Sequence, residues 1–141
     1  MSDKYFADTN ILVYAFDKRE PEKQQIAQEI LITLGSSYNL TISTQVLQEF
    51  FVTITRKLQP AFSFEVAYEL VEEFACYPIV EINFQMILAA IKRNQQGYVS
   101  FWDALIIEAA LKNNCNILLS EDMQDGQFID NQLIIKNPFK K

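Results

Sequence analysis

The sequence contains no histidine. This absence removes the acid and base that enzymes use most often near neutral pH, and every catalytic pair that depends on an imidazole. It also removes the usual zinc ligand. The two cysteines, Cys76 and Cys115, lie in separate apolar segments, where we expect buried, reduced thiols rather than a disulfide. Any chemistry must therefore depend on other side chains.

Glycine is also scarce, with three residues in the chain: Gly35, Gly97 and Gly126. Their positions exclude the glycine-rich loops that bind nucleotide phosphates. The apolar runs are too short to cross a bilayer, and the first five residues, MSDKY, lack the hydrophobic segment of a secretory signal. We therefore expect a cytoplasmic protein that does not associate with a membrane.

Positive charge is in deficit. The chain has 18 acidic and 12 basic residues, for a net charge of −6, which is opposite to that of a protein that holds nucleic acid by bulk charge. If the substrate is a polyanion, divalent cations or local basic pairs such as Arg56 and Lys57 must supply positive charge. An acidic surface also suits a basic protein partner.

The length of 141 residues, half of them hydrophobic, is that of one globular domain, which we place over residues 1–141. Periodicity predicts strands at 4–7, 40–42, 77–82, 117–119 and 133–135. It predicts helices at 10–16, 21–34, 45–57, 64–74, 84–95 and 100–112. Strands that alternate with helices indicate a three-layer α/β fold with a central, mainly parallel sheet flanked by helices.

Four acidic residues interrupt apolar stretches at corresponding places in this pattern. Asp8 closes the first strand and Asp122 closely follows the strand at 117–119, so both should lie at carboxyl ends of strands, where open α/β sheets bind ligands. Glu49 and Asp103 lie early in helices that we expect to begin at the same edge. We therefore predict that these four carboxylates, which come from distant parts of the chain, meet in one cleft.

Each acid also has a simpler interpretation. Asp8 can cap the turn that follows it, and Glu49 can lie on a solvated helix face. Asp103 lies in an S-x-x-D sequence that is close to a capping box. Asp122 and Asp125 can be ordinary turn residues before a glycine. Taken together, these interpretations do not explain why the acids gather at one predicted edge.

Clustered carboxylates repel one another unless protons or a cation neutralise them. A site made of oxygen ligands without histidine or cysteine favours Mg²⁺ or Mn²⁺ over zinc. Because Mg²⁺ combines one or two protein carboxylates with substrate phosphates, the pattern points to phosphoryl or phosphodiester chemistry.

Two motifs resemble those of a known family: FADTNILVYA at 6–15 and SFWDALI at 100–106. Weaker similarity lies in QEF at 48–50 and LLSED at 118–122. In this order and spacing they resemble the PIN-domain ribonucleases, and most of all the VapC-type toxins of bacterial toxin–antitoxin pairs.

The resemblance implies a PIN-like fold and metal-dependent endonucleolytic cleavage of RNA, with a cognate antitoxin and a homodimer. It implies that the catalytic and metal-binding acids are Asp8, Glu49, Asp103 and Asp122. Of these, Asp8 and Asp103 are the foremost candidates for direct ligands of the metal. The expected metal is Mg²⁺, and Mn²⁺ is expected to substitute for it.

Three further polar residues, Asn10, Ser120 and Asp125, are candidates for orienting these acids, although Asn10 and Ser120 can equally satisfy local backbone groups.

Aromatic residues precede Asp103. We expect Phe101 and Trp102 to pack in the core, with stacking on RNA bases as the alternative.

Two other functions stay open at this point. A metal-dependent phosphomonoesterase also uses carboxylates, but the sequence has no D-x-D-x-T nucleophile motif. A non-catalytic PIN-like interaction module would keep the acids only as helix caps.

Overall fold

The computed structural model describes residues 3–141. In this range six strands form one sheet in the order β3-β2-β1-β4-β6-β5, and β5 alone is antiparallel to its neighbour. The strands are β1 (Tyr5–Ala7), β2 (Leu40–Ser43), β3 (Ile79–Val80), β4 (Ile117–Leu119), β5 (Phe128–Ile129) and β6 (Leu133–Lys136). The helices are α1 (Thr9–Tyr14), α2 (Pro21–Ser36), α3 (Thr44–Arg56), α4 (Phe64–Glu73), α5 (Phe84–Gln95) and α6 (Phe101–Lys112).

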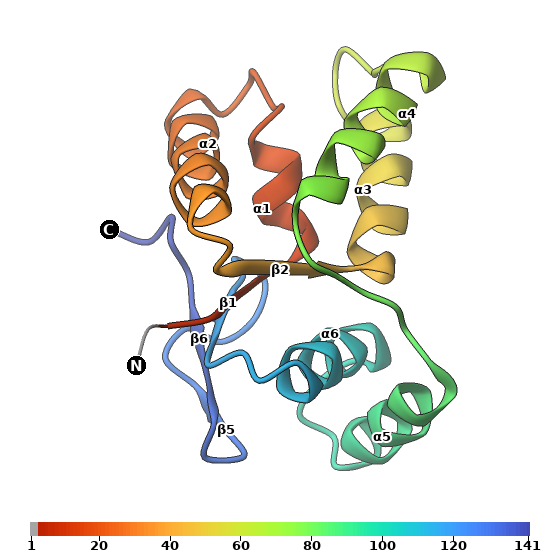
Figure 1. The fold of residues 1–141 in the computed structure, drawn as a ribbon, viewed down its shortest axis with the longest axis vertical. Coiled ribbons are helices and arrows are strands. Elements are labelled where there is room, and N and C mark those ends of the chain that lie inside the picture. Colours follow the sequence, from red (N-terminus) through yellow and green to blue (C-terminus); the bar gives the residue numbers. More distant parts are fainter. Residues whose placement is uncertain (1–2) are drawn as a thin grey trace.

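The helices form two layers around the sheet. Helices α1 to α4 lie on one side of it, and α5 and α6 pack together on the other (Figure 1). The chain moves from β1 to β2 and then to β3 at one edge of the sheet. It then returns to β4, which lies on the other side of β1. Because parallel crossovers are right-handed, this reversal places the last two helices on the opposite face. The predicted three-layer α/β fold is confirmed.

The reversal also locates a crevice. Strands β1 and β4 are neighbours, but the chain leaves β1 into the layer of α1 to α4, whereas it reaches β4 from α6 in the opposite layer. Open α/β sheets bind ligands at such a switch point. The fold therefore places the candidate site where β1 and β4 end.

Side-chain caps fix the starts of five helices, α1, α3, α4, α5 and α6, and three of these, α1, α3 and α6, reach this crevice. Ser43 Oγ accepts a hydrogen bond from the Val46 amide (3.3 Å), and Ser100 Oγ accepts one from the Asp103 amide (3.1 Å). Helix α6 is buried over most of its length, from Ala104 to Ala110. Its nearly all-apolar sequence predicted such burial.

The strand predictions need two corrections. The strand expected at 77–82 shrinks to Ile79–Val80, because Pro78 cannot donate a ladder hydrogen bond. Strand β5 was not predicted. It forms a hairpin with β6 around Asp130 and Asn131, which have φ angles of 52° and 53°. Asp and Asn tolerate this conformation better than other non-glycine residues, so the Asp-Asn dipeptide was the available signal.

The prediction for the cysteines is half right. Cys115 is buried, but Cys76 is exposed in the short 3-10 turn that follows α4. None of the helices in residues 3–141 is both long and apolar enough to cross a membrane.

Phe50 anchors the layer that contains α1, α3 and α4. Its side chain is fully buried, and its ring makes edge contacts with Phe16 (5.8 Å between centroids) and Phe74 (5.1 Å). We expect Phe50→Ala to lower the free energy of unfolding by about 3–5 kcal/mol, because it leaves a cavity. Phe84→Ala, at a side chain that is 67% exposed, should cost less than about 0.5 kcal/mol. Urea titration measures both, and equal losses would contradict this account of the core.

Candidate active site

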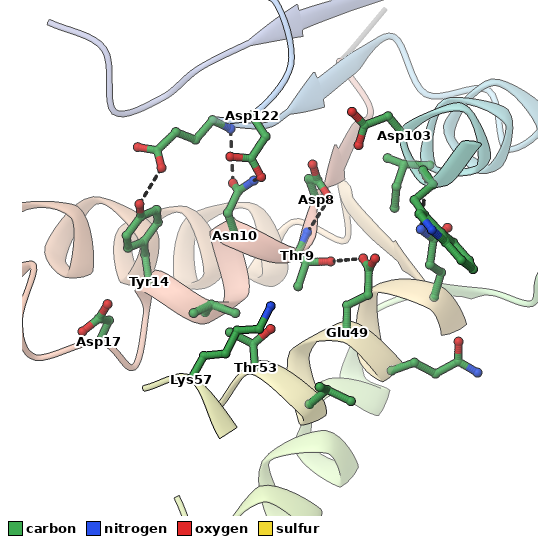
Figure 2. A pocket seen from close by; sticks show the side chains of 17 residues that line it. Asp8, Thr9, Asn10, Tyr14, Asp17, Glu49, Thr53, Lys57, Asp103 and Asp122 are labelled. Atoms are coloured by element: carbon green, nitrogen blue, oxygen red, sulfur yellow. Dashed lines mark hydrogen bonds between the residues drawn. The ribbon is translucent and has the colours of Figure 1, made fainter. Parts of the chain in front are cut away.

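A cleft of about 700 Å³ lies at the carboxyl ends of β1 and β4, between α1, α3 and the first turn of α6. The four predicted acids, Asp8, Glu49, Asp103 and Asp122, all line it (Figure 2). The structure therefore brings together side chains that are separated by up to 114 positions, as the strand and helix pattern predicted.

Asp8 is the most buried of the four carboxylates, with 6% of its surface exposed. The parallel register of β1 and β4 pairs Ala7 with Leu119, so the next residues, Asp8 and Ser120, meet beyond the sheet. One carboxylate oxygen accepts the Thr9 amide at the start of α1 (2.7 Å), and the other accepts the Ser120 hydroxyl (2.8 Å). The capping interpretation of Asp8 is therefore right, and it is compatible with a place in the cleft.

Burial governs the titration of Asp8. Removal from water raises the pKa of its carboxyl most, the hydrogen bonds from Ser120 and Thr9 lower it, and the nearby charges of Asp103 and Glu49 raise it, so that the pKa lies at about 7. Without a cation, this group holds its proton up to nearly neutral pH.

Ser120 and Asn10 connect the two sides of the cleft. The Ser120 hydroxyl also accepts the amide of Asp122 (3.2 Å). Asn10 Nδ2 donates to Asp122 Oδ2 (3.1 Å), and Asn10 Oδ1 accepts the Glu121 amide (3.2 Å). Both residues thus donate a hydrogen bond to an acid of the cleft, and both also accept one from a backbone amide.

Glu49 reaches the cleft from α3. The polar residues Gln45, Glu49, Thr53 and Lys57 recur every four positions, which places them on one helical face, and all four line the cleft. Glu49 Oε1 accepts the Thr9 hydroxyl (2.6 Å). The polar stripe that suggested a solvated helix face belongs to the wall of the cleft.

Asp103 lies in the first turn of α6, where the Ser100 hydroxyl caps its amide. Its pKa is raised first by partial burial and then by the charges of Asp122 and Glu49, with the Ser100 hydrogen bond opposing. Asp8 and Asp103 therefore both respond electrostatically to the other acids of the cleft.

Glu121 is a further acid that the sequence analysis missed. Lys23 Nζ lies 2.6 Å from its carboxylate, and the Tyr14 hydroxyl donates to the same group. Burial alone would raise the pKa of Glu121, but these two hydrogen bonds outweigh burial and lower it. Glu121 therefore carries its own cation. No local pattern signals this pair, because its members are 98 positions apart.

Asp125 is not part of the cleft. Its carboxylate accepts the Asn137 amide (2.8 Å) and lies 3.5 Å from Lys140. These contacts fix the turn against the C-terminal segment, so the structure supports the turn interpretation and not an orienting role for Asp125.

The prediction for the aromatic residues before Asp103 is wrong at one position. Phe101 is partly buried against the core, but Trp102 is 60% exposed and lines the cleft. The apolar character of α6 predicted burial for both. Trp102 instead lies in the first turn, at the mouth of the switch point, and not in the part of the helix that covers the sheet.

The donor chemistry of the cleft fits a hard divalent cation. The acids offer only oxygen ligands, and mutual repulsion already perturbs two of them. Over residues 3–141, no three acidic or thiol side chains are close enough to form a preformed cage around an ion. Mg²⁺ does not require one, since it binds through one or two carboxylates and keeps several waters.

The PIN domain family model matches residues 5–125. The chain therefore belongs to the PIN domain family, as its motifs indicated. No curated protein matches the sequence significantly.

Solved structures share this fold over nearly the whole chain. One belongs to a toxin–antitoxin complex from Klebsiella pneumoniae, with a TM-score of 0.70, 16% identity, and coverage of 98% of this chain and 100% of that one. Another is VapC20 of Mycobacterium tuberculosis, a toxin that cleaves the sarcin–ricin loop. Its TM-score is 0.66 at 16% identity, and the match covers 92% of this chain and 99% of that one. A third is DNA-bound VapBC2 from Rickettsia felis. Its TM-score is 0.64 at 22% identity, and the match covers 94% of this chain and 97% of that one.

The raised pKa of Asp8 predicts how metal-free stability depends on pH. The folded protein binds this proton more tightly than the unfolded chain does, so its contribution to stability is full below about pH 4 and is lost as pH rises through about 7. Asp8→Asn keeps a capping side chain and lacks the titration. In EDTA, the free energy of unfolding of Asp8→Asn, measured relative to that of the parent protein, should rise by up to about 4 kcal/mol from about pH 4 to about pH 8. Chemical denaturation at both pH values measures this difference, and a constant difference would contradict it.

Proposed function

We propose that this protein is a metal-dependent endoribonuclease that hydrolyses phosphodiester bonds in RNA, and that it acts as the toxin of a type II toxin–antitoxin pair. The observation that carries the proposal is Asp8, a buried carboxylate held between two further acids at the switch point of the sheet. A purely structural cap would be more stable without those charges beside it. Membership of the PIN domain family supports the same function.

Asp8 and Asp103 are the residues that we expect to hold Mg²⁺, with Mn²⁺ as a substitute and with Glu49 and Asp122 completing the acidic set. When bound, the ion supplies positive charge that stabilises a phosphodiester undergoing in-line displacement and lowers the pKa of a bound water. Ser120 donates a hydrogen bond to one oxygen of Asp8 and so fixes the orientation of this carboxylate.

The chain's own residues have separate tasks in this scheme. Glu49 is held by the Thr9 hydroxyl, and Asp122 by Asn10, so each presents its carboxylate in a fixed position. Either carboxylate can orient the attacking water or accept its proton. Glu121, which is neutralised by Lys23, contributes to the shape of the cleft without adding a free negative charge.

A basic antitoxin is the partner that the charge favours. The protein carries a net charge of −6, and its cleft is acidic. A segment rich in arginine would form charge-assisted hydrogen bonds with the carboxylates and block access to them. The complexes from Klebsiella pneumoniae and Rickettsia felis, which share this fold, support an antitoxin as the partner.

Replacement of a proposed ligand separates catalysis from folding. Asp8→Asn and Asp103→Asn keep the side-chain shape but remove the anionic ligand, so RNA cleavage in Mg²⁺ should fall by at least about 100-fold. Asp125→Asn, outside the cleft, should cleave at close to the parent rate. Cleavage of a labelled RNA measures all three, with circular dichroism as the control for folding. Near-parent cleavage by Asp8→Asn would exclude the proposed site.

Metal binding itself has a direct readout. Mg²⁺ or Mn²⁺ at about 100 times its dissociation constant should stabilise the protein by about 2.7 kcal/mol through mass action. The double variant Asp8→Asn, Asp103→Asn should show no comparable rise in melting temperature. A non-catalytic interaction module predicts no response in the parent protein either, and that result would argue against the proposal.

A further inference from the structure

Trp102 is a large aromatic side chain in the cleft that the fold does not require. It is 60% exposed, although most of α6 is buried, and it lies next to Asp103 in the sequence. We propose that its ring is the platform on which an unpaired base of a single-stranded RNA substrate stacks. This inference rests on the proposed ribonuclease function and adds a substrate-binding residue outside the acidic set.

The position of Trp102 is fixed before any ligand arrives. Its backbone carbonyl accepts a hydrogen bond from Gln45 Nε2 (3.1 Å), and the Phe101 ring contacts it edge-on at 5.1 Å between centroids. Gln45 is itself buried. The Gln45 bond holds the backbone of Trp102 against α3, and the Phe101 ring packs against the indole; both restraints reduce the conformational freedom that is lost when a base binds, which favours stacking.

Helix α3 extends from this platform across the acidic centre. Gln45 contacts Trp102, Glu49 lies one turn further, and Lys57 lies two turns beyond Glu49. Figure 2 shows Glu49, Thr53 and Lys57 following one another along the helix. The stripe covers twelve residue steps, or about 18 Å. An RNA strand that lies along this stripe would meet the Trp102 ring at one end, then the carboxylates, and Lys57 at the far end.

Lys57 supplies the second contact. Among the described residues it is the only basic side chain that lines the cleft, and it is exposed. A phosphate beside Lys57 and a base on Trp102 would hold one strand on both sides of the carboxylates. Stacking provides sequence-tolerant affinity, and the lysine provides the part that depends on salt.

The neighbours of the ring favour a nucleic acid over a protein anchor. The exposed side chain of Gln48 lines the same cleft from α3, three residues after Gln45, and an amide can pair with the edge of a base. A double helix would not satisfy the ring, because its bases are already stacked and paired. Single-stranded RNA is therefore the ligand that uses both the ring and the lysine.

Trp102 is the only tryptophan in the chain, so intrinsic fluorescence reports on the proposed platform alone. The test uses the parent protein in Ca²⁺, which binds carboxylate oxygens without the near-ideal octahedral geometry of Mg²⁺, so the protein should bind RNA without consuming it. Titration with a short dye-labelled oligoadenylate should quench the tryptophan emission as the anisotropy of the dye rises. A hairpin duplex of the same length should bind more weakly and leave the emission unchanged.

Variants measured under the same conditions assign the contacts of the RNA with Trp102 and with Lys57. Trp102→Leu should weaken oligoadenylate binding by roughly 5- to 150-fold without changing its salt dependence, and Trp102→Phe should recover part of the loss. Lys57→Gln should instead reduce the slope of log affinity against log salt by about 0.7. Tyr98→Leu removes an aromatic that is 84% exposed but lies outside this cleft, and it should bind like its parent.

The outcomes distinguish failure of this inference from failure of the proposed function. If the oligoadenylate binds but neither the emission nor the Trp102→Leu affinity changes, stacking is wrong and the ribonuclease proposal stands. If it binds to none of these proteins, both fail. If iodide cannot reach the tryptophan in the free protein, or if its emission changes with protein concentration alone, a protein surface covers the ring and the inference is overturned.

Discussion

The parallel pairing of β1 with β4 is the constraint on which the site depends. It places the residues that follow these strands, Asp8 and Ser120, within hydrogen-bonding distance in a buried position. The same pairing marks the point at which the helices change from one face of the sheet to the other. A one-residue slip in this register would turn Asp8 away from Ser120. The site is thus a consequence of how the sheet closes.

Stability and chemistry make opposing demands on Asp8, and hydrogen bonds at both carboxylate oxygens reconcile them only in part. The amide of Thr9 and the hydroxyl of Ser120 favour the charged form, yet burial and the neighbouring acids leave the pKa near 7. Removing those neighbours would make a better cap. Their place around a buried carboxylate fits the proposed cation, which would relieve the repulsion that the free protein carries.

Sequence reasoning recovered the fold class and the convergence of four acids because both follow from local periodicity and topological rules. It missed what depends on contacts between distant segments. The pairing of Glu121 with Lys23 has no local signature. The sequence predicted a buried Trp102 because its helix is apolar nearly all round. Periodicity does not show which turn of a helix packs on the sheet and which turn extends beyond it. Asp125 was overvalued because its proximity to Asp122 in sequence does not extend to the cleft.

Charge determines what the cleft can accept. Its acids exclude a polyanion in the absence of cations, since one lysine cannot balance them. Glu121 already has a partner in Lys23, which limits the excess negative charge to the acids around Asp8. A hard cation placed there would convert a repulsive surface into one that binds a phosphodiester, while Lys57 acts further along α3. Under the proposed function, the net charge of −6 would serve selectivity, because it weakens the non-specific attraction of nucleic acid to the protein surface as a whole.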